Sequence, residues 1–419
     1  MISQKFHRYR TRLLLLLAVV GPGIITANVD NDAGGITTYS VAGAHYGYSL
    51  LWMLGLVALA LIIIQEMSAR LGVVTGKGLA DLIRESMGVR ATAIIIGIVL
   101  FANLANTVSE FAGVAASMEI FGISKYVSVP IVAVLVWLLI VKGNYKVVER
   151  IFLVASAIYL SYVLSGILAN PPWGQVLQAT VTPSFHLDVG YVTIFVTIIG
   201  TTIAPWMQFY QQASIVDKGI RVEQFGYERI DVVVGSLFAV LVAAFITIAC
   251  AATLFAHGVR IETAQDAALA LGPLAGQHAA TLFALGLLNA SVFSAAILPL
   301  STAYVVCEAF GWESGVSRDW KDAPVFFFVY TALIVLGAGI FLFPIKSLVE
   351  TMLASQTLNG VLLPVVLVTM LKLINDKRIM GEYVNGRIMN LLSWATVGIL
   401  IVLTVILVVV SVFPGVFGK

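Results

Sequence analysis

Apolar runs of roughly 18 or more residues recur along almost the whole chain, separated by short polar segments. Such runs are typical of transmembrane helices, because about 20 residues of α-helix cross the hydrocarbon core of a bilayer. The pattern predicts an all-α integral membrane protein with eleven transmembrane helices. The predicted spans lie near residues 12–43, 48–71, 91–121, 127–141, 149–168, 189–214, 229–256, 277–309, 324–343, 347–373 and 389–413. The first run resembles a signal peptide, but no small-residue cleavage site follows it, so we assign it as the first helix.

Composition and charge agree with this class. The chain has 419 residues, of which 60% are hydrophobic and 11% charged, whereas a soluble domain carries about 25% charged residues. The net charge of +2 predicts no nucleic-acid partner. Placing the N-terminus in the cytoplasm puts 20 of the 24 Lys and Arg residues on cytoplasmic segments. We therefore expect a multi-pass protein of a prokaryotic plasma membrane, with a cytoplasmic N-terminus and a C-terminus outside.

The first predicted span contains a polar break. The apolar pattern stops at Asn28 and resumes after Gly35. The break includes Asp30, Asn31, Asp32 and Gly34. A carboxylate at membrane depth costs ~2.5–3.5 kcal/mol on insertion scales, so it persists only if it is paired, hydrated or bound to a cation. A surface loop between two short spans is the alternative, but it would leave too few residues after Arg12 to cross the bilayer.

The sixth predicted span contains a second break, at Gly200, Thr201, Thr202 and Pro205. Proline has no amide hydrogen, so the carbonyl of Thr201 loses its helical partner. A plain proline kink is the alternative. Breaks at corresponding positions five spans apart favour a transporter of two inverted five-helix repeats. We predict repeats at residues 1–170 and 171–375, followed by span 11 at 376–419.

The breaks offer oxygen donors only, since neither contains Cys, His or Met. Such a site suits hard cations such as Mg²⁺, Ca²⁺ or Mn²⁺. Asp30 either attracts the hydrated ion from a second layer or pairs with Asn359, and Asn31 is expected to satisfy freed backbone groups. A sodium-coupled amino-acid carrier is disfavoured, because two Asp residues would repel a substrate carboxylate. The sequence lacks a phosphate-binding loop and an HExxH motif, so we expect neither an enzyme nor a bound cofactor.

Four segments of the chain together resemble one family. They are Gly21-Pro-Gly23 followed by Asp32-Ala-Gly-Gly35, then residues 42–48, residues 68–80 and residues 380–385. The chain resembles the NRAMP family of divalent metal transporters, and more closely its NRAMP-related magnesium-transporter branch. This resemblance implies a LeuT-like fold with unwound helices 1 and 6. It also implies a metal site built from the Asp32 side chain, the Val29 and Thr201 carbonyls, and Gln356.

The chain departs from the family pattern at four positions. Gly35 replaces an Asn ligand, Ala204 replaces a Met ligand, and Trp206 and Gln211 replace two His residues. Loss of the sulfur ligand removes a reason to prefer transition metals over Mg²⁺, and loss of an oxygen ligand favours a partly hydrated ion. We assign Trp206 and Gln211 to the gate or cavity.

Proton coupling is the remaining question. The His residues are all expected near or outside the interfaces, so groups titrating near neutral pH are missing from the span centres. Glu110 aligns with a family proton carrier and keeps coupling open, although Asn106 or Asn103 could instead satisfy it. We expect a monomeric, uniporter-like carrier of Mg²⁺ and also Mn²⁺. The alternative is a proton-coupled Mn²⁺/Fe²⁺ symporter. Away from the breaks, Glu66 is interpreted as part of a solvated i,i+4 ion pair.

Overall fold

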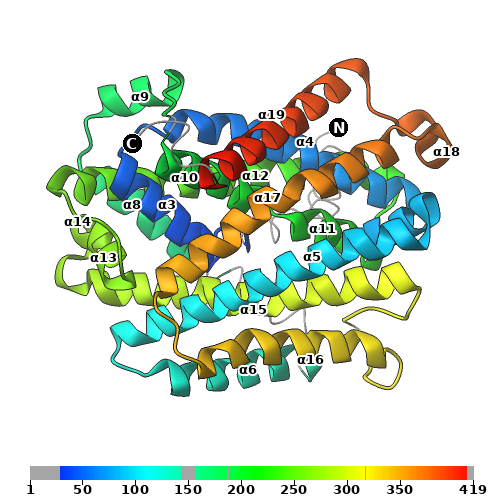
Figure 1. Cartoon of the computed structure of the whole chain (residues 1–419), viewed down its shortest axis with the longest axis horizontal. Coiled ribbons are helices and arrows are strands. Elements are labelled where there is room, and N and C mark those ends of the chain that lie inside the picture. The colour runs from blue at the N-terminus through cyan, green and yellow to red at the C-terminus, as the bar shows by residue number, and fades with distance from the viewer. Residues whose placement is uncertain (1–28, 143–153, 155, 187, 317, 413–419) are drawn as a thin grey trace, which may run out of the picture.

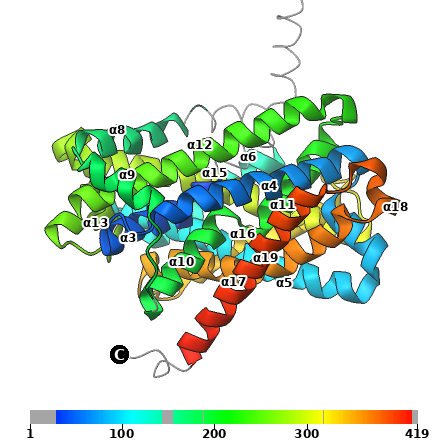
Figure 2. The same ribbon diagram turned by 90° about the horizontal axis from the view of Figure 1, so that it is seen from above.

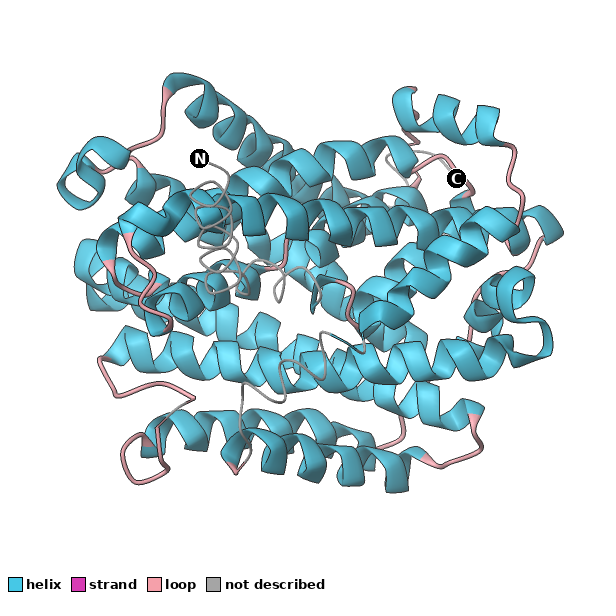
Figure 3. Ribbon diagram, turned by 180° about the vertical axis from the view of Figure 1, so that it is seen from behind, coloured by secondary structure: helices cyan, strands magenta, loops and turns pink. Residues whose placement is uncertain are grey.

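The computed structural model describes residues 29–142, 154, 156–186, 188–316 and 318–412. Within these ranges every regular element is a helix (Figure 3), as predicted. The α-helices are α3 (Ala33–Tyr46), α4 (Leu51–Thr75), α5 (Leu79–Ile120), α6 (Lys125–Val141), α8 (Leu160–Leu168), α9 (Trp173–Val181), α10 (Val189–Thr202), α11 (Pro205–Asp217), α12 (Phe225–Thr253), α13 (Ala264–Ala268), α14 (Gly272–Ala275), α15 (Ala279–Phe310), α16 (Pro324–Gly339), α17 (Leu348–Ile374), α18 (Lys377–Met380) and α19 (Arg387–Val412).

Eight helical segments in the described ranges are long and apolar enough to cross a bilayer. Each coincides with one predicted span, and the shorter helix α6 coincides with another. A helix suits this environment because it satisfies its backbone hydrogen bonds within its own segment. Residues 12–28 and 149–153 lie outside the described residues, so the count of eleven stays a prediction.

Helix α5 is two helices joined at Gly88. This glycine has φ 75° and ψ 170°, a conformation that favours glycine because it has no Cβ. The longer part, after Gly88, matches the predicted span at 91–121. The shorter part was not predicted as a helix.

The helices form layers around α3. Helices α5 and α15 lie side by side across the molecule, with α6 and α16 along one flank (Figure 1), and α19 lies on another face (Figure 2). Residues 33–44 of α3 are all buried, and the helix contacts α12, α17, α10 and α5. The helix that begins at the predicted polar break is therefore enclosed by other helices.

Glycines allow close backbone approach between these helices. A Cβ on Gly200 of α10 would collide with the Gln356 carbonyl of α17, and one on Gly360 of α17 would collide with the Val196 carbonyl of α10. Gly43 of α3 is similarly pressed against the Thr247 carbonyl of α12. Small residues at helix contacts are typical of packing in membranes. These contacts fix α17 against the second break.

An ion cluster around the buried Glu66 carboxylate joins α4 to the first residues of α12. The Glu66 carboxylate accepts from Arg70 at 3.1 Å and from Arg229 at 2.9 Å. Arg70 also donates to the Tyr383 carbonyl and the Asn385 side chain, in the segment before α19. The Glu66 and Arg70 side chains are only 5% and 9% exposed. The prediction of a solvated pair was therefore wrong, because the segment before α19 covers it.

Candidate functional site

The first predicted break is confirmed at the start of α3. Residues 29 and 30 are helical, residues 31 and 32 form a turn and bend, and α3 begins at Ala33. Asp32 is extended, with φ −69° and ψ −175°, and its Oδ1 accepts from the Gly35 N–H at 2.6 Å. A carboxylate is stabilised here because the free amides and the dipole of the helix N-terminus are positive.

The second break is confirmed between α10 and α11. Helix α10 ends at Thr202, Ile203 and Ala204 are non-helical, and Pro205 opens α11. Because Pro205 has no N–H, the Thr201 carbonyl has no partner four residues on. The negative end of α10 and the positive end of α11 thus both lie at this break.

The two breaks meet at Gly35. A Cβ on Gly35 would lie 2.6 Å from the Asp30 carbonyl oxygen, 3.2 Å from Thr201 Oγ1 and 3.3 Å from Asp32 Oδ1. Oxygen atoms from both broken helices therefore surround a point that only glycine leaves open.

Gln356 of α17 adds an amide to this point. Its Nε2 lies 3.4 Å from both Asp32 carboxylate oxygens, and its Oε1 accepts from Asn359 at 2.9 Å. Asn359 and Asn106 of α5 exchange two hydrogen bonds, at 2.9 and 3.1 Å. Asn359 therefore orients Gln356. The alternative that it pairs with Asp30 was wrong, because its amide is occupied by Asn106 and Gln356.

Several buried oxygens at the breaks have no hydrogen-bond partner. They are both carboxylate oxygens of Asp30, Oδ1 of Asn31 and Oγ1 of Thr201. Asp30 is only 2% exposed. The amide of Asn31 donates to the Ala239 carbonyl of α12 at 3.4 Å, so Asn31 does bind backbone, although on another helix. Burying unpaired polar groups is costly, so these oxygens fit a bound cation.

Glu110 of α5 adds a second carboxyl group beside Asp32. Its Oε2 accepts from the Ala33 N–H at 3.3 Å and lies within hydrogen-bonding reach of the Asp32 side chain. Neither suggested asparagine holds it, because Asn106 pairs with Asn359 and Asn103 donates to Thr302 at 2.8 Å. That expectation was wrong, since Asn106 and Asn103, four and seven residues before Glu110, are bonded to α17 and α15 instead.

The remaining predicted residues lie around the second break. Val29 is fully buried just before Asp30. Ala204 caps α11, and its carbonyl accepts from the Met207 N–H at 3.2 Å. Trp206 is buried, with its ring 6.1 Å from that of Tyr210. Gln211 is also buried, and neither of its amide atoms has a hydrogen-bond partner.

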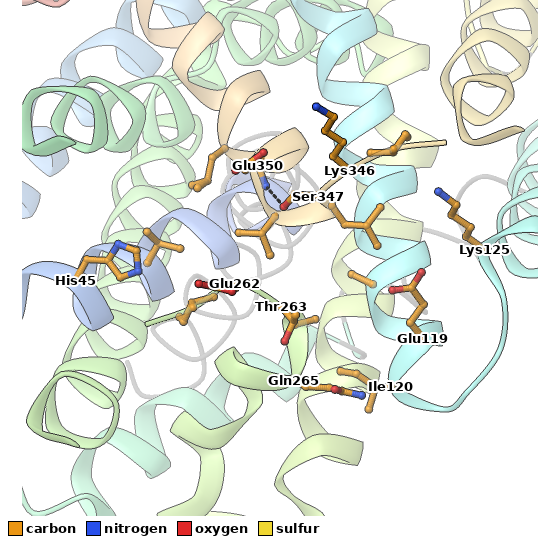
Figure 4. A pocket seen from close by; sticks show the side chains of 18 residues that line it. His45, Glu119, Ile120, Lys125, Glu262, Thr263, Gln265, Lys346, Ser347 and Glu350 are labelled. Carbon is orange, nitrogen blue, oxygen red and sulfur yellow. Dashed lines mark hydrogen bonds between the residues drawn. The ribbon is translucent and has the colours of Figure 1, made fainter. Parts of the chain in front are cut away.

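A cavity of about 810 Å³ lies at the end of the molecule where α3 ends and α17 begins (Figure 4). Its charged and polar lining includes Glu119, Glu262, Glu350, His45, Lys125, Lys346, Ser347, Thr263 and Gln265. Leu353, also in the lining, lies one helical turn from Gln356. Between the cavity and the breaks, Thr37 Oγ1 contacts Met352 Sδ at 3.4 Å. The cavity was not predicted, because its acidic residues come from three separate segments.

Within the described residues, no three His, Cys, Asp or Glu side chains form a metal-binding group. Any cation at the breaks would therefore depend on carbonyl, hydroxyl and amide oxygens beside the carboxylates. Such mixed oxygen sites are usual for Mg²⁺ and Ca²⁺.

Comparison with known proteins places this geometry in a family. The family model described as natural resistance-associated macrophage protein-like matches residues 23–410. The divalent metal cation transporter MntH of Ralstonia nicotianae is 28% identical over 90% of this chain and 88% of its own. MntH of Bacillus subtilis is 26% identical over 94% of this chain and 92% of its own.

Solved structures show the same fold. The manganese transporter of Eremococcus coleocola matches with a TM-score of 0.74 and 24% identity, over 93% of this chain and 86% of that one. MHP1, a nucleobase-cation-symport-1 family transporter, matches with a TM-score of 0.58 and 16% identity, over 94% and 91%. The chain has the LeuT-like fold, and it belongs to the natural resistance-associated macrophage protein (Nramp) family.

Proposed function

We propose that this protein carries divalent metal ions across the membrane by alternating access and binds them where its two broken helices meet. The observation that carries the proposal is that the Asp30 carbonyl, the Asp32 carboxylate and the Thr201 hydroxyl converge around Gly35. The relatives described above are named divalent metal cation transporters or manganese transporters. Nramp proteins are transporters, which agrees with the prediction that the chain is not an enzyme.

We assign the cargo site to residues on α3, α10, α11 and α17. Asp32 supplies the carboxylate, Val29 and Thr201 supply carbonyls, and Gln356 holds the Asp32 carboxylate through its amide Nε2. Gly35 and Ala204 leave space in which a partly hydrated ion keeps water molecules. The Asp30 and Asn31 side chains act from a second layer, and Asn359 orients Gln356. Trp206 and Gln211 belong to the gate or to the cavity beside it.

The cargo has two candidate identities. The names of the relatives support Mn²⁺, and on the comparisons alone this alternative is the better supported. The donor set supports Mg²⁺ in addition, because Ala204 provides no sulfur and the donors at the breaks are oxygen atoms. We therefore propose that the site accepts both ions.

One observation favours proton coupling, and another favours uncoupled transport. The buried Glu110 beside Asp32 could carry a proton, which favours the symporter. Trp206 and Gln211 stand where the family pattern has His, which favours uncoupled transport. We propose uncoupled, uniporter-like transport, by a monomer in a prokaryotic plasma membrane. The repeat limits, 1–170 and 171–375 with 376–419 as an appendage, belong to this proposal.

Uptake into proteoliposomes tests the cargo and the coupling together. Vesicles with an inside-negative voltage would contain a metal-sensitive or a pH-sensitive dye. The proposal predicts saturable uptake of both Mn²⁺ and Mg²⁺ without acidification of the lumen. The variant Ala204→Met should shift selectivity toward Mn²⁺. Uptake of Mn²⁺ alone, with acidification, would establish the symporter instead.

A further inference from the structure

A second group of buried polar side chains lies away from the breaks, on α11 and α12. Glu228 and Asp231 are three residues apart on α12, so they share one face of that helix. The Gln211 side chain of α11 lies beside the Glu228 carboxylate. We call Gln211, Glu228 and Asp231 the inner cluster.

The inner cluster lies between the breaks and one end of the molecule. Asn31 contacts the Ala239 carbonyl of α12. Asp231 and Glu228 precede Ala239 by eight and eleven residues, which is about 12 and 16 Å along a helix. The opposite end of α12 lies near the end of α3, where Gly47 packs against Phe255. The inner cluster and the cavity beside Glu350 are thus on opposite sides of the breaks.

Two members of the inner cluster, Glu228 and Gln211, are buried and incompletely satisfied. Glu228 and Gln211 are both 0% exposed. Both carboxylate oxygens of Glu228 and both amide atoms of Gln211 lack hydrogen-bond partners. The nearby Arg229 is directed to Glu66 instead, at 2.9 Å. Lys218 is the positive charge that acts on the Glu228 carboxylate. A buried carboxylate whose oxygens have no close hydrogen-bond donor is costly, and a bound cation would relieve that cost.

We propose that the inner cluster is a second divalent-cation site, which the transported ion occupies between the breaks and the cytoplasm. Two carboxylates and an amide oxygen are hard ligands, and water molecules would complete the coordination shell. The inference rests on the proposed transport of divalent ions. It adds a site that is separate from the two breaks themselves, although Gln211 lies further along α11.

Counting bound Mn²⁺ tests this site. The full chain in lipid nanodiscs would be titrated with Mn²⁺, and free Mn²⁺ would be measured by its electron paramagnetic resonance signal. Two ions should bind the unmodified protein, and one ion should remain in either Asp32→Ala or Glu228→Gln. Glu228→Asp should restore the second ion, whereas the exposed control Glu223→Gln should bind two throughout. Losing one carboxylate should weaken the inner site about tenfold or more, since affinity follows ligand charge.

The other outcomes separate the two proposals. One ion in the unmodified protein, lost in Asp32→Ala and kept in Glu228→Gln, would overturn the inner site and leave the transport proposal intact. No bound Mn²⁺ in the unmodified protein would contradict both. Melting temperatures of the variants within a few degrees of the unmodified protein would show that a lost ion does not reflect unfolding.

Discussion

Gly35→Ala is the sharpest single test of the site geometry. The added methyl carbon would lie 2.6 Å from the Asp30 carbonyl oxygen, where ordinary contacts are about 3.4 Å or longer. The backbone must therefore move by roughly 0.8 Å. The Thr201 hydroxyl and the Asp32 carboxylate lie beside the added methyl group and leave little room for that movement. Overpacking of this kind costs about 1–3 kcal/mol. If the strain falls on the bound state, the affinity for metal should fall roughly 5- to 150-fold.

The assay is metal uptake by Gly35→Ala as a function of metal concentration. The matched control is Gly55→Ala, which adds the same methyl group to α4 at a position with no atom within 4 Å. This control should transport normally and could gain up to about 1 kcal/mol of helix stability. Gly35→Ala with unchanged apparent affinity and rate would refute the idea that oxygens from both breaks define the metal position.

Two further variants test the surroundings of the site. Gln356→Ala removes the amide beside the Asp32 carboxylate and should weaken metal binding by about 1.5–3 kcal/mol in a binding titration. The exposed control Gln277→Ala should leave the affinity unchanged. Equal affinities of the two variants would exclude Gln356 from the site. Glu66→Ala removes the counter-charge of the buried Arg70 guanidinium and should lower the free energy of unfolding by about 3–5 kcal/mol, measured by denaturant unfolding in micelles. Glu85→Ala breaks a half-exposed ion pair and should cost at most about 1 kcal/mol, so similar losses would contradict the burial argument.

Local features explain what the sequence could predict. A proline removes a helical hydrogen bond wherever it occurs within a helix, so Pro205 marks a break. Asp30 and Asp32 cannot continue an apolar run. Both breaks could therefore be located before any contact was known. The apolar run lengths likewise located the spans, because bilayer thickness fixes them.

Long-range contacts explain what could not be predicted from the sequence. The pairing of Asn106 with Asn359 joins residues 253 apart in sequence, and nothing local to either residue specifies it. The same holds for Glu110, whose partner lies at the start of α3. Glu66 and Arg70 do form the predicted i,i+4 pair, but burial by the segment before α19 depends on packing. Glu228 was overlooked because a charged residue near a span end is ordinarily solvated.

The measurement closest to the central claim is Mn²⁺ and Mg²⁺ uptake by proteoliposomes containing Asp32→Ala. The control is Asp319→Ala, which removes an exposed carboxylate from a loop. We predict saturable uptake by the unmodified protein and by Asp319→Ala, and uptake at the level of empty vesicles in Asp32→Ala. Uptake by Asp32→Ala at the unmodified rate, or uptake of neither ion by the unmodified protein, would contradict a divalent metal carrier with its site at the broken helices.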